Sequence, residues 1–210
     1  MLDILFSPDQ FFRERAGNPG LRGPLLVVTV VAVLGVVAAY PAAQAVRSAL
    51  PPEAQGFGGI TVVTTMVGAL IGPFAGWVLY TGVFHGISAV VYDGEGSFGD
   101  TLKLVGWGFV PALLTGVVGC VVAFLVWPSV TFPEFSDPAR VQQFTQEIRN
   151  RPAFLVQSVL GLAVLVWQGL LWTFAVQYAR EIEFRKAAVS VVVPVLLVFL
   201  WKLNGIVGVV

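Results

Sequence analysis

The sequence predicts an all-α integral membrane protein with five transmembrane helices. Of its 210 residues, 57% are apolar and only 11% are charged, whereas soluble domains carry about 25% charged residues. So little charge cannot cover the surface of a water-soluble globule of this size, which excludes a soluble enzyme. Lys and Arg (12) balance Asp and Glu (12), so the chain also lacks the basic field that a nucleic-acid partner requires.

The charged residues are gathered between long uncharged stretches. Residues 23–46, 54–92, 104–133, 152–179 and 187–201 contain no Asp, Glu, Lys or Arg. A helix needs roughly 20 apolar residues to cross a hydrocarbon core about 30 Å thick. Strands of a membrane barrel would be about ten residues long with alternating polarity, which these runs are not. We therefore expect five helical spans, near residues 24–46, 60–91, 104–127, 153–178 and 187–209.

Two of these spans do not fit a simple apolar crossing, one because of its length and one because of a charged residue. The second is longer than one crossing requires and contains Gly72-Pro73. A kink at that pair, or an interfacial segment before Met66, would absorb the excess length. The fifth span contains Lys202 near its end, where the ammonium group can snorkel to the lipid headgroups.

The distribution of Lys and Arg predicts the orientation of the spans. With five crossings, the N-terminus, the 92–103 loop and the 179–186 loop lie on one side and hold seven of the twelve basic residues. The positive-inside rule then places the N-terminus in the cytoplasm and the C-terminus outside.

The chain divides into a cytoplasmic N-terminal segment, residues 1–23, and a membrane domain, residues 24–210, which contains the five spans. Its longest loop, residues 128–152, has the pattern of an amphipathic helix lying on the outer membrane surface. That helix would serve either as a membrane-surface cap or as an external docking site.

The N-terminal segment contains the signals of a short helix. Ser7, Pro8 and Gln10 have the spacing of a capping box with proline at the first helical position, and Phe6 and Phe11 have that of a hydrophobic staple. We expect an interfacial helix here. It would act either as an anchor that positions a partner-binding edge or as a lid packed over the first span.

The residues needed for catalysis are nearly absent. The single cysteine, Cys120, lies inside an apolar run with no nearby cation to lower its pKa. We find no phosphate-binding loop, no Ser/His/Asp arrangement and no metalloprotease pattern. The sequence therefore predicts no enzyme and no cofactor.

The single histidine, His85, lies toward the end of the second span, and three carboxylates follow in the next loop: Asp93, Glu95 and Asp100. An ionisable residue within a span is a functional hypothesis by default, here a cation or proton site. The alternative is a neutral imidazole hydrogen-bonded to a neighbouring helix. One histidine cannot form a structural zinc site without three further good ligands, so no metal is assigned.

Small residues form a glycine stripe in the second span. The stripe consists of Gly68, Gly72, Gly76, Gly82 and Gly86, most of them four residues apart. It removes side chains from one helix face and lets another backbone approach closely. Packing within the monomer is one use of such a face, and self-association into a homo-oligomer is the other.

Residues 94–111 read Gly-Glu-Gly-Ser-Phe-Gly-Asp-Thr-Leu-Lys-Leu-Val-Gly-Trp-Gly-Phe-Val-Pro. This stretch resembles the Yip family, membrane proteins named for interacting with Ypt/Rab GTPases. In that family a short cytoplasmic loop with a Phe leads into the third span and is followed by Gly-aromatic-x-x-x-Pro. Here these positions are Phe98, Gly106-Trp107 and Pro111, with Trp where a Tyr is usual. The lead at residues 5–12 is similar to the start of prokaryotic members.

Eukaryotic members carry Asp-Leu-Tyr-Gly-Pro before the first span and a long acidic cytoplasmic arm. This chain has Gly20-Leu21-Arg22-Gly23-Pro24 and no such arm, so the resemblance implies a prokaryotic member and the family fold more directly than GTPase binding. It also implies the candidate partner-binding residues Leu21, Gly23, Pro24, Phe98, Gly106, Trp107 and Pro111.

Two functions follow as hypotheses. The first is a non-enzymatic membrane scaffold that contacts the lipid bilayer and binds a protein partner at its cytoplasmic face, in the cell membrane of a prokaryote. The alternative is a small ion or solute transporter or channel, with His85 and the nearby carboxylates at its cytoplasmic mouth. Ionisable groups within the spans are reduced to His85 and Lys202. Because charges cost about 2.5–3.5 kcal/mol each at a helix centre and a pump would tolerate them, this scarcity favours the scaffold.

Overall fold

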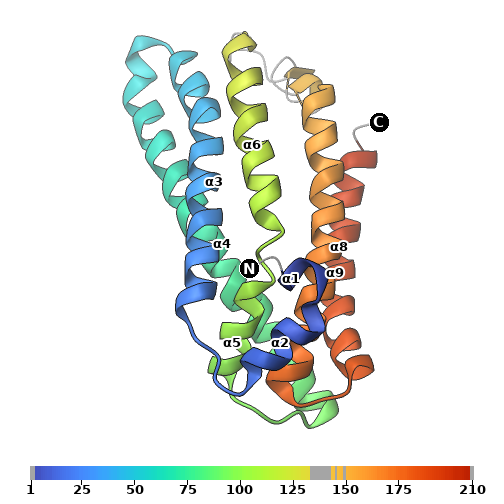
Figure 1. The fold of residues 1–210 in the computed structure, drawn as a ribbon. Helices are drawn as coiled ribbons and strands as arrows, with labels where there is room; N and C mark the ends of the chain where they lie inside the picture. Colours follow the sequence, from blue (N-terminus) through green and yellow to red (C-terminus); the bar gives the residue numbers. More distant parts are fainter. Residues whose placement is uncertain (1–2, 133–142, 145, 149, 209–210) are drawn as a thin grey trace.

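Five long helices form the body of the protein (Figure 1). The structure is a computed structural model that describes residues 3–132, 143–144, 146–148 and 150–208. Within these residues every regular element is helical, and five helices are long and apolar enough to cross a membrane, which confirms the predicted fold class. They are α3 (Arg22–Ser48), α4 (Gln55–Tyr92), α6 (Ala112–Val126) with its continuation η2 (Trp127–Ser129), α8 (Pro152–Arg180) and α9 (Phe184–Val207).

The shorter helices α2 (Pro8–Ala16) and α5 (Phe98–Trp107) lie toward one end of this bundle, and α1 (Asp3–Phe6) lies beside its middle. A single turn, η1 (Pro52–Ala54), precedes α4 at the other end. At one end of the bundle, α2 and α5 lie against the last turns of α4 and α8. We call this the α2–α5 end. It is the lower end in Figure 1. The Lys and Arg distribution predicts that this end is cytoplasmic.

The predicted third span, residues 104–127, is divided between two helices. α5 ends at Trp107, and α6 begins at Ala112. Between them the backbone N–H groups of Gly108, Phe109 and Val110 donate to carbonyls three residues back, the tighter pattern of a 3₁₀ turn. Pro111 has no N–H to donate to the Trp107 carbonyl, and together with the 3₁₀ turn before it this interrupts the α-helical hydrogen bonds between α5 and α6. The membrane-crossing part therefore starts about two turns later than the apolar run.

The second span is one continuous helix. α4 has 38 residues, which at 1.5 Å per residue is about 57 Å and exceeds the bilayer core. The helix is continuous through Pro73, and it starts well before Met66. Figure 1 shows α4 crossing the bundle obliquely. The kink at Gly72-Pro73 and the interfacial segment before Met66 stay predictions.

The core is built around α8. In the most apolar stretch of α8, 56% of residues are buried inside the protein, against 6% for α4. Trp172 is the largest fully buried side chain of the described residues, and the rings of Tyr80, Phe84 and Phe109 lie 4.7–5.6 Å from it, centroid to centroid. Aromatic pairs at such distances add to the burial energy. α2, α4, α5, α6 and α9 pack on α8, whereas α3 packs on α4, α5 and α6.

Two tryptophans hold α5 in place. Trp77 on α4 donates its ring N–H to the Leu102 carbonyl at 2.7 Å, and Trp172 on α8 donates to the Val105 carbonyl at 3.0 Å. The Val105 carbonyl also accepts from the Gly108 N–H, so it takes two hydrogen bonds at the end of α5. α5 is thereby fixed to both α4 and α8.

The amphipathic helix expected in the 128–152 loop includes residues 138–142, 145 and 149, which lie outside the described residues. It stays a prediction.

Candidate functional site

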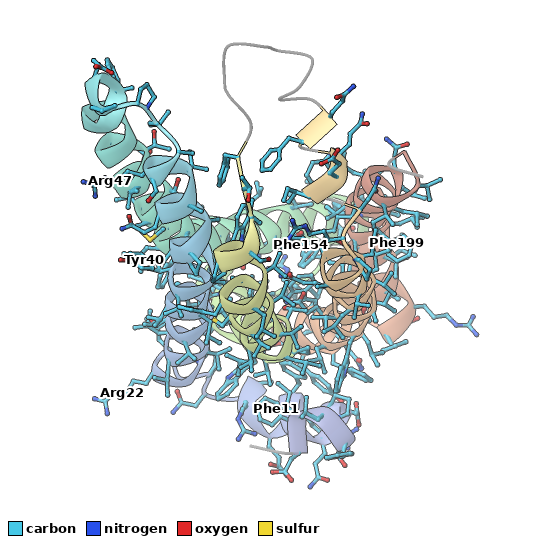
Figure 2. All side chains as sticks on the ribbon, turned by 90° about the horizontal axis from the view of Figure 1, so that it is seen from above. Phe11, Arg22, Tyr40, Arg47, Phe154 and Phe199 are labelled. Atoms are coloured by element: carbon cyan, nitrogen blue, oxygen red, sulfur yellow. The ribbon has the colours of Figure 1, made fainter. Side chains whose placement is uncertain are left out.

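The N-terminal helix α2 is docked onto the bundle by two phenylalanines. Phe11 and Phe12 are 1% and 0% exposed. Phe11 meets Trp107 of α5 edge to face, with ring centroids 5.2 Å apart, and the Arg15 guanidinium lies 3.7 Å from the centroid of the Phe11 ring. Figure 2 shows α2, with Phe11, lying on one side of the bundle, outside the group of long helices. The N-terminal helix α2 is thus packed over α5 and α8, and not over the first span as the lid prediction had it.

The start of α2 differs from our expectation. Pro8 is in the first turn as predicted, but the Ser7 side chain makes no capping hydrogen bond. The Ser7 backbone (φ −141°, ψ 58°) departs from the extended conformation usual at this position, and the Gln10 amide binds Glu14 at 2.8 Å instead. Phe6 is 81% exposed while Phe11 is buried. The predicted capping box and hydrophobic staple are therefore wrong.

A polar network joins the outer side of α2 to α8. The Tyr178 hydroxyl donates to Asp9 Oδ1 at 2.5 Å, and Arg13 Nε donates to the Tyr178 oxygen at 3.1 Å. Arg13 also pairs with Asp9. The hydrogen bond to Tyr178, followed by the charge of Asp9, raises the pKa of Arg13 above its ordinary value. Because surface ion pairs contribute little alone, we regard this network as fixing the position of α2 on a surface that Phe11 and Phe12 already bury.

Four of the candidate partner-binding residues pack against one another. A Cβ on Gly23 would lie 2.2 Å from the Trp107 ring, and a Cβ on Gly106 would lie 2.6 Å from Pro24 Cβ and 2.8 Å from the Trp77 ring. Only glycine permits these approaches, since real Cβ atoms do not come so close. The two motifs, more than 80 residues apart in sequence, therefore form one contact between α3 and α5.

The other three candidates divide between surface and core. Leu21 is 45% exposed and Phe98 is 42% exposed, whereas Pro111 is buried. Phe98 lies with its ring edge-on to His85, 5.5 Å between centroids. Of the seven residues, Leu21 and Phe98 are therefore those whose side chains are exposed enough for a partner to contact.

The histidine and the three carboxylates are not gathered into one site. His85 Nδ1 lies 3.1 Å from the Thr101 hydroxyl, and Asp100 accepts from Ser97 (2.7 Å) and Lys103 (3.0 Å). Asp93 ends α4 in the left-handed conformation. No group of three or more His, Cys, Asp or Glu residues that could hold a metal occurs in the described parts of the chain. The arrangement resembles the alternative expectation, an imidazole bonded to a neighbouring helix.

Hydrogen bonds stabilise the ionised form of the Asp100 carboxyl. The bond from Ser97, then that from Lys103, lower the pKa of Asp100 below its usual range. Ser97 Oγ also accepts from the Asp100 backbone N–H at 3.1 Å, which caps the first turn of α5. Ser97 and Asp100 thus define where α5 begins.

A buried arginine that the sequence did not identify organises the loop between α4 and α5. Arg180, the last residue of α8, is 2% exposed. Its Nε donates to Ser88 Oγ at 3.1 Å, and its two terminal nitrogens donate to the carbonyls of Gly94 and Gly96. Gly96 has φ +84°, and a Cβ there would lie 2.2 Å from the Ala179 carbonyl oxygen, so this position requires glycine.

Arg180 lies where both α4 and α8 end. A cation near a helix C-terminus is stabilised by the partial negative charge of the last carbonyls, and here the end of α4 supplies the Ser88 hydroxyl as well. In the sequence, Arg180 follows the uncharged run 152–179, and Gly94-Glu95-Gly96 lies in the loop after the second span. Neither feature indicates by itself that Arg180 contacts this loop.

The glycine stripe of α4 does not pack within the monomer. A Cβ added at any of its five positions would meet nothing within 4 Å, so the expectation that these glycines receive another helix of the same chain is wrong. α4 packs on α3, but the glycines do not lie at that contact. Self-association through this face stays a prediction.

Comparison with known proteins gives one family and one relative. The family model described as the Yip1 domain matches residues 2–203. An uncharacterized protein of the archaeon Methanocaldococcus jannaschii is 28% identical over 125 residues, which is 59% of this chain and 88% of that protein. No solved structure matches the chain.

Proposed function

This chain belongs to the Yip1 domain family, and on that premise we propose that it is a non-enzymatic membrane scaffold that binds a protein partner at its α2–α5 end. The cell membrane of a prokaryote is the proposed location, because the relative that the chain resembles is archaeal. The protein partner is a proposal of its own, since the family membership supports a membrane role without naming a partner.

The observation that carries the proposal is the rigid docking of α2. Buried Phe11 and Phe12 and the Tyr178 network hold this helix against α5 and α8. A partner binds a preorganised surface at a lower entropic cost than a mobile one. Leu21 (45%) and Phe98 (42%) are exposed near this end, and Phe6 (81%) is exposed at the end of α1, just before the docked helix. Large aromatic residues are typical anchors of interfaces.

The transporter alternative has less support. It was motivated by His85 with its three carboxylates. In the structure His85 bonds Thr101 and Asp100 bonds Ser97 and Lys103, and these groups form no metal-binding cluster within the described parts of the chain. We therefore do not carry the transporter forward.

Site-specific photocrosslinking in native membranes tests the scaffold. A photoreactive amino acid is placed at Phe6 or at Phe98, and in the matched control at Leu197, an exposed residue (66%) in the middle of α9. We expect the same protein to be captured from positions 6 and 98 and not from 197, as identified by mass spectrometry. Capture should fall when the other aromatic residue is replaced by Asp.

The structure also refines the choice of variants. Trp107 packs on Gly23 and Phe11, so its replacement would disturb the fold together with any interface, whereas Phe6→Asp and Phe98→Asp change exposed side chains. Identical protein sets from all three crosslinking positions, or crosslinks to lipid alone at positions 6 and 98, would contradict the scaffold proposal.

A further inference from the structure

The end of the bundle opposite α2 contains a large cavity. It has a volume of about 920 Å³, within the range of about 300–1,000 Å³ that is typical of ligand sites. It lies over the face of α8 between α6 and α9, both of which pack on α8. Its lining extends from Phe154 to Trp172 of α8, about 27 Å of helix at 1.5 Å per residue.

The floor of the cavity is aromatic and lies deep in the bundle. Tyr80, Phe109 and Trp172 line it there, and they belong to the core cluster around α8. The indole N–H of Trp172 is already bonded to the Val105 carbonyl, so this tryptophan offers its apolar ring. Seen from above in Figure 2, Phe154 lies near the middle of the bundle. The walls therefore suit hydrocarbon.

One turn above the floor, a buried amide faces the cavity. Gln168 lines it and is 8% exposed, and its side chain makes no hydrogen bond within the described residues of the chain. Its amide group is therefore available to a ligand in the cavity. A ligand with a carbonyl or hydroxyl group at this depth would satisfy the Gln168 amide.

Nearer the membrane surface the lining becomes polar and carries a positive charge. Lys202 and Asn204 of α9 contribute there, together with Gln157 of α8. Lys202 is the one charged residue among the described residues that line the cavity. A negatively charged group is thus attracted to this end, whereas a cation is repelled.

Along its length the cavity combines aromatic rings, from Trp172 at the floor to Trp127 and Trp201, with the Gln168 amide and the Lys202 ammonium group. A phospholipid has complementary groups: hydrocarbon chains for the rings, ester carbonyls of the glycerol backbone for an amide, and a phosphate for an ammonium group. We propose that this cavity binds an anionic phospholipid of the surrounding bilayer. Its phosphate lies at Lys202, a glycerol-ester carbonyl accepts from Gln168, and hydrocarbon contacts Trp172. The site is separate from the partner-binding surface proposed at the α2–α5 end.

The experiment measures lipid retention by the purified full-length protein using native mass spectrometry. Phosphatidylglycerol, phosphatidylcholine and water-soluble glycerol 3-phosphate are added separately in detergent. We expect tightest retention of phosphatidylglycerol and none of glycerol 3-phosphate. Lys202→Ala should weaken phosphatidylglycerol binding by about tenfold or more, since charge-assisted hydrogen bonds are among the strongest. Lys186→Ala, at the other end of α9, should not, and Gln168→Leu should weaken both lipids.

A pair of glycine variants separates the cavity from the general lipid-facing surface. A Cβ at Gly161 or at Gly72 meets nothing within 4 Å, but only Gly161 lines the cavity. Gly161→Phe should therefore displace the retained lipid while Gly72→Phe should not, with helix content checked by circular dichroism. Equal retention of the two lipids by wild type, unchanged binding by Lys202→Ala, or equal effects of the two Phe variants would each overturn the proposal. If Gly161→Phe does not fold, the Lys202 and Gln168 variants still decide it.

Discussion

Glycine has opposite environments at the α2–α5 end and along α4. Gly23, Gly106 and Gly108 lie under tryptophan rings, with 2.2–2.8 Å from a Cβ to the ring. The glycine stripe of α4 meets nothing within 4 Å. Only the first set is required by packing inside this chain, although the second has the more regular spacing. Regularly spaced glycines show that one face of a helix has no side chains. Whether that face is packed depends on whether a neighbouring helix places a large side chain against it.

The largest effect expected from this comparison comes from adding volume at Gly106. Gly106→Leu would drive a side chain into Pro24 and the Trp77 ring, and we expect it to lower the free energy of unfolding by about 3 kcal/mol. Gly72→Leu, on the stripe, should change it by less than about 1 kcal/mol. Unfolding in mixed detergent micelles measures both. Equal losses would show that the stripe is packed after all.

Removing the Arg180 guanidinium tests whether it holds the loop between α4 and α5, which lies at the α2–α5 end. Arg180→Met leaves the Gly94 and Gly96 carbonyls and the Ser88 hydroxyl without this donor, and a buried group without its partner costs about 1–3 kcal/mol. We expect a loss of about 2–3 kcal/mol and faster hydrogen exchange in residues 93–97. The exposed Arg185→Met serves as the control. If both variants unfold alike, Arg180 does not organise the loop.

A smaller effect is expected where α2 meets α8. Tyr178→Phe removes the hydroxyl that joins Asp9 and Arg13 but leaves Phe11 and Phe12 buried, so the loss should be about 1 kcal/mol. Hydrogen exchange should accelerate in α2 and not in α3. Tyr40→Phe, which alters an exposed residue of α3 (48%), provides the comparison. An unchanged exchange rate in α2 would show that the network adds nothing to the aromatic docking.

The smallest effect is a pH dependence at the start of α5. Hydrogen bonds from Ser97 and Lys103 hold the pKa of Asp100 below its ordinary value of 3.8, so the unfolded chain takes up the proton first as the pH falls. This contribution to stability is complete above the unfolded pKa and is lost as the pH falls through the folded pKa. Melting temperatures of wild type and Asp100→Asn, measured between about pH 3 and pH 6, should converge toward low pH. A constant difference between them would contradict this assignment.

The spans could be predicted because the bilayer acts on each segment separately. A helix in hydrocarbon must satisfy its own backbone hydrogen bonds, so uncharged runs of sufficient length report crossings directly. The third span shows where this fails: the apolar run around residue 104 is buried in protein rather than in lipid, and hydropathy does not distinguish the two environments. The helix is interrupted between Gly108 and Pro111 because of the 3₁₀ turn and the missing N–H of Pro111, and a hydropathy profile does not show such an interruption.

The candidate site was only partly predictable. The residues Gly23, Pro24, Gly106 and Trp107 were identified from the family resemblance, but their role in packing required the crossing of α3 and α5. Arg180 was missed because its partners are the carbonyls of Gly94 and Gly96, and backbone acceptors leave no residue-type signature.

The sequence alone determined the membrane class, the five crossings and a short N-terminal helix, because composition and hydropathy act locally along the chain. The tertiary structure decided which glycines touch a tryptophan, where the buried cation lies, and that Gln168 and Lys202 line one cavity. These features depend on side chains from helices far apart in the sequence meeting in space. Close packing is a property of pairs of surfaces, which no single segment of sequence contains.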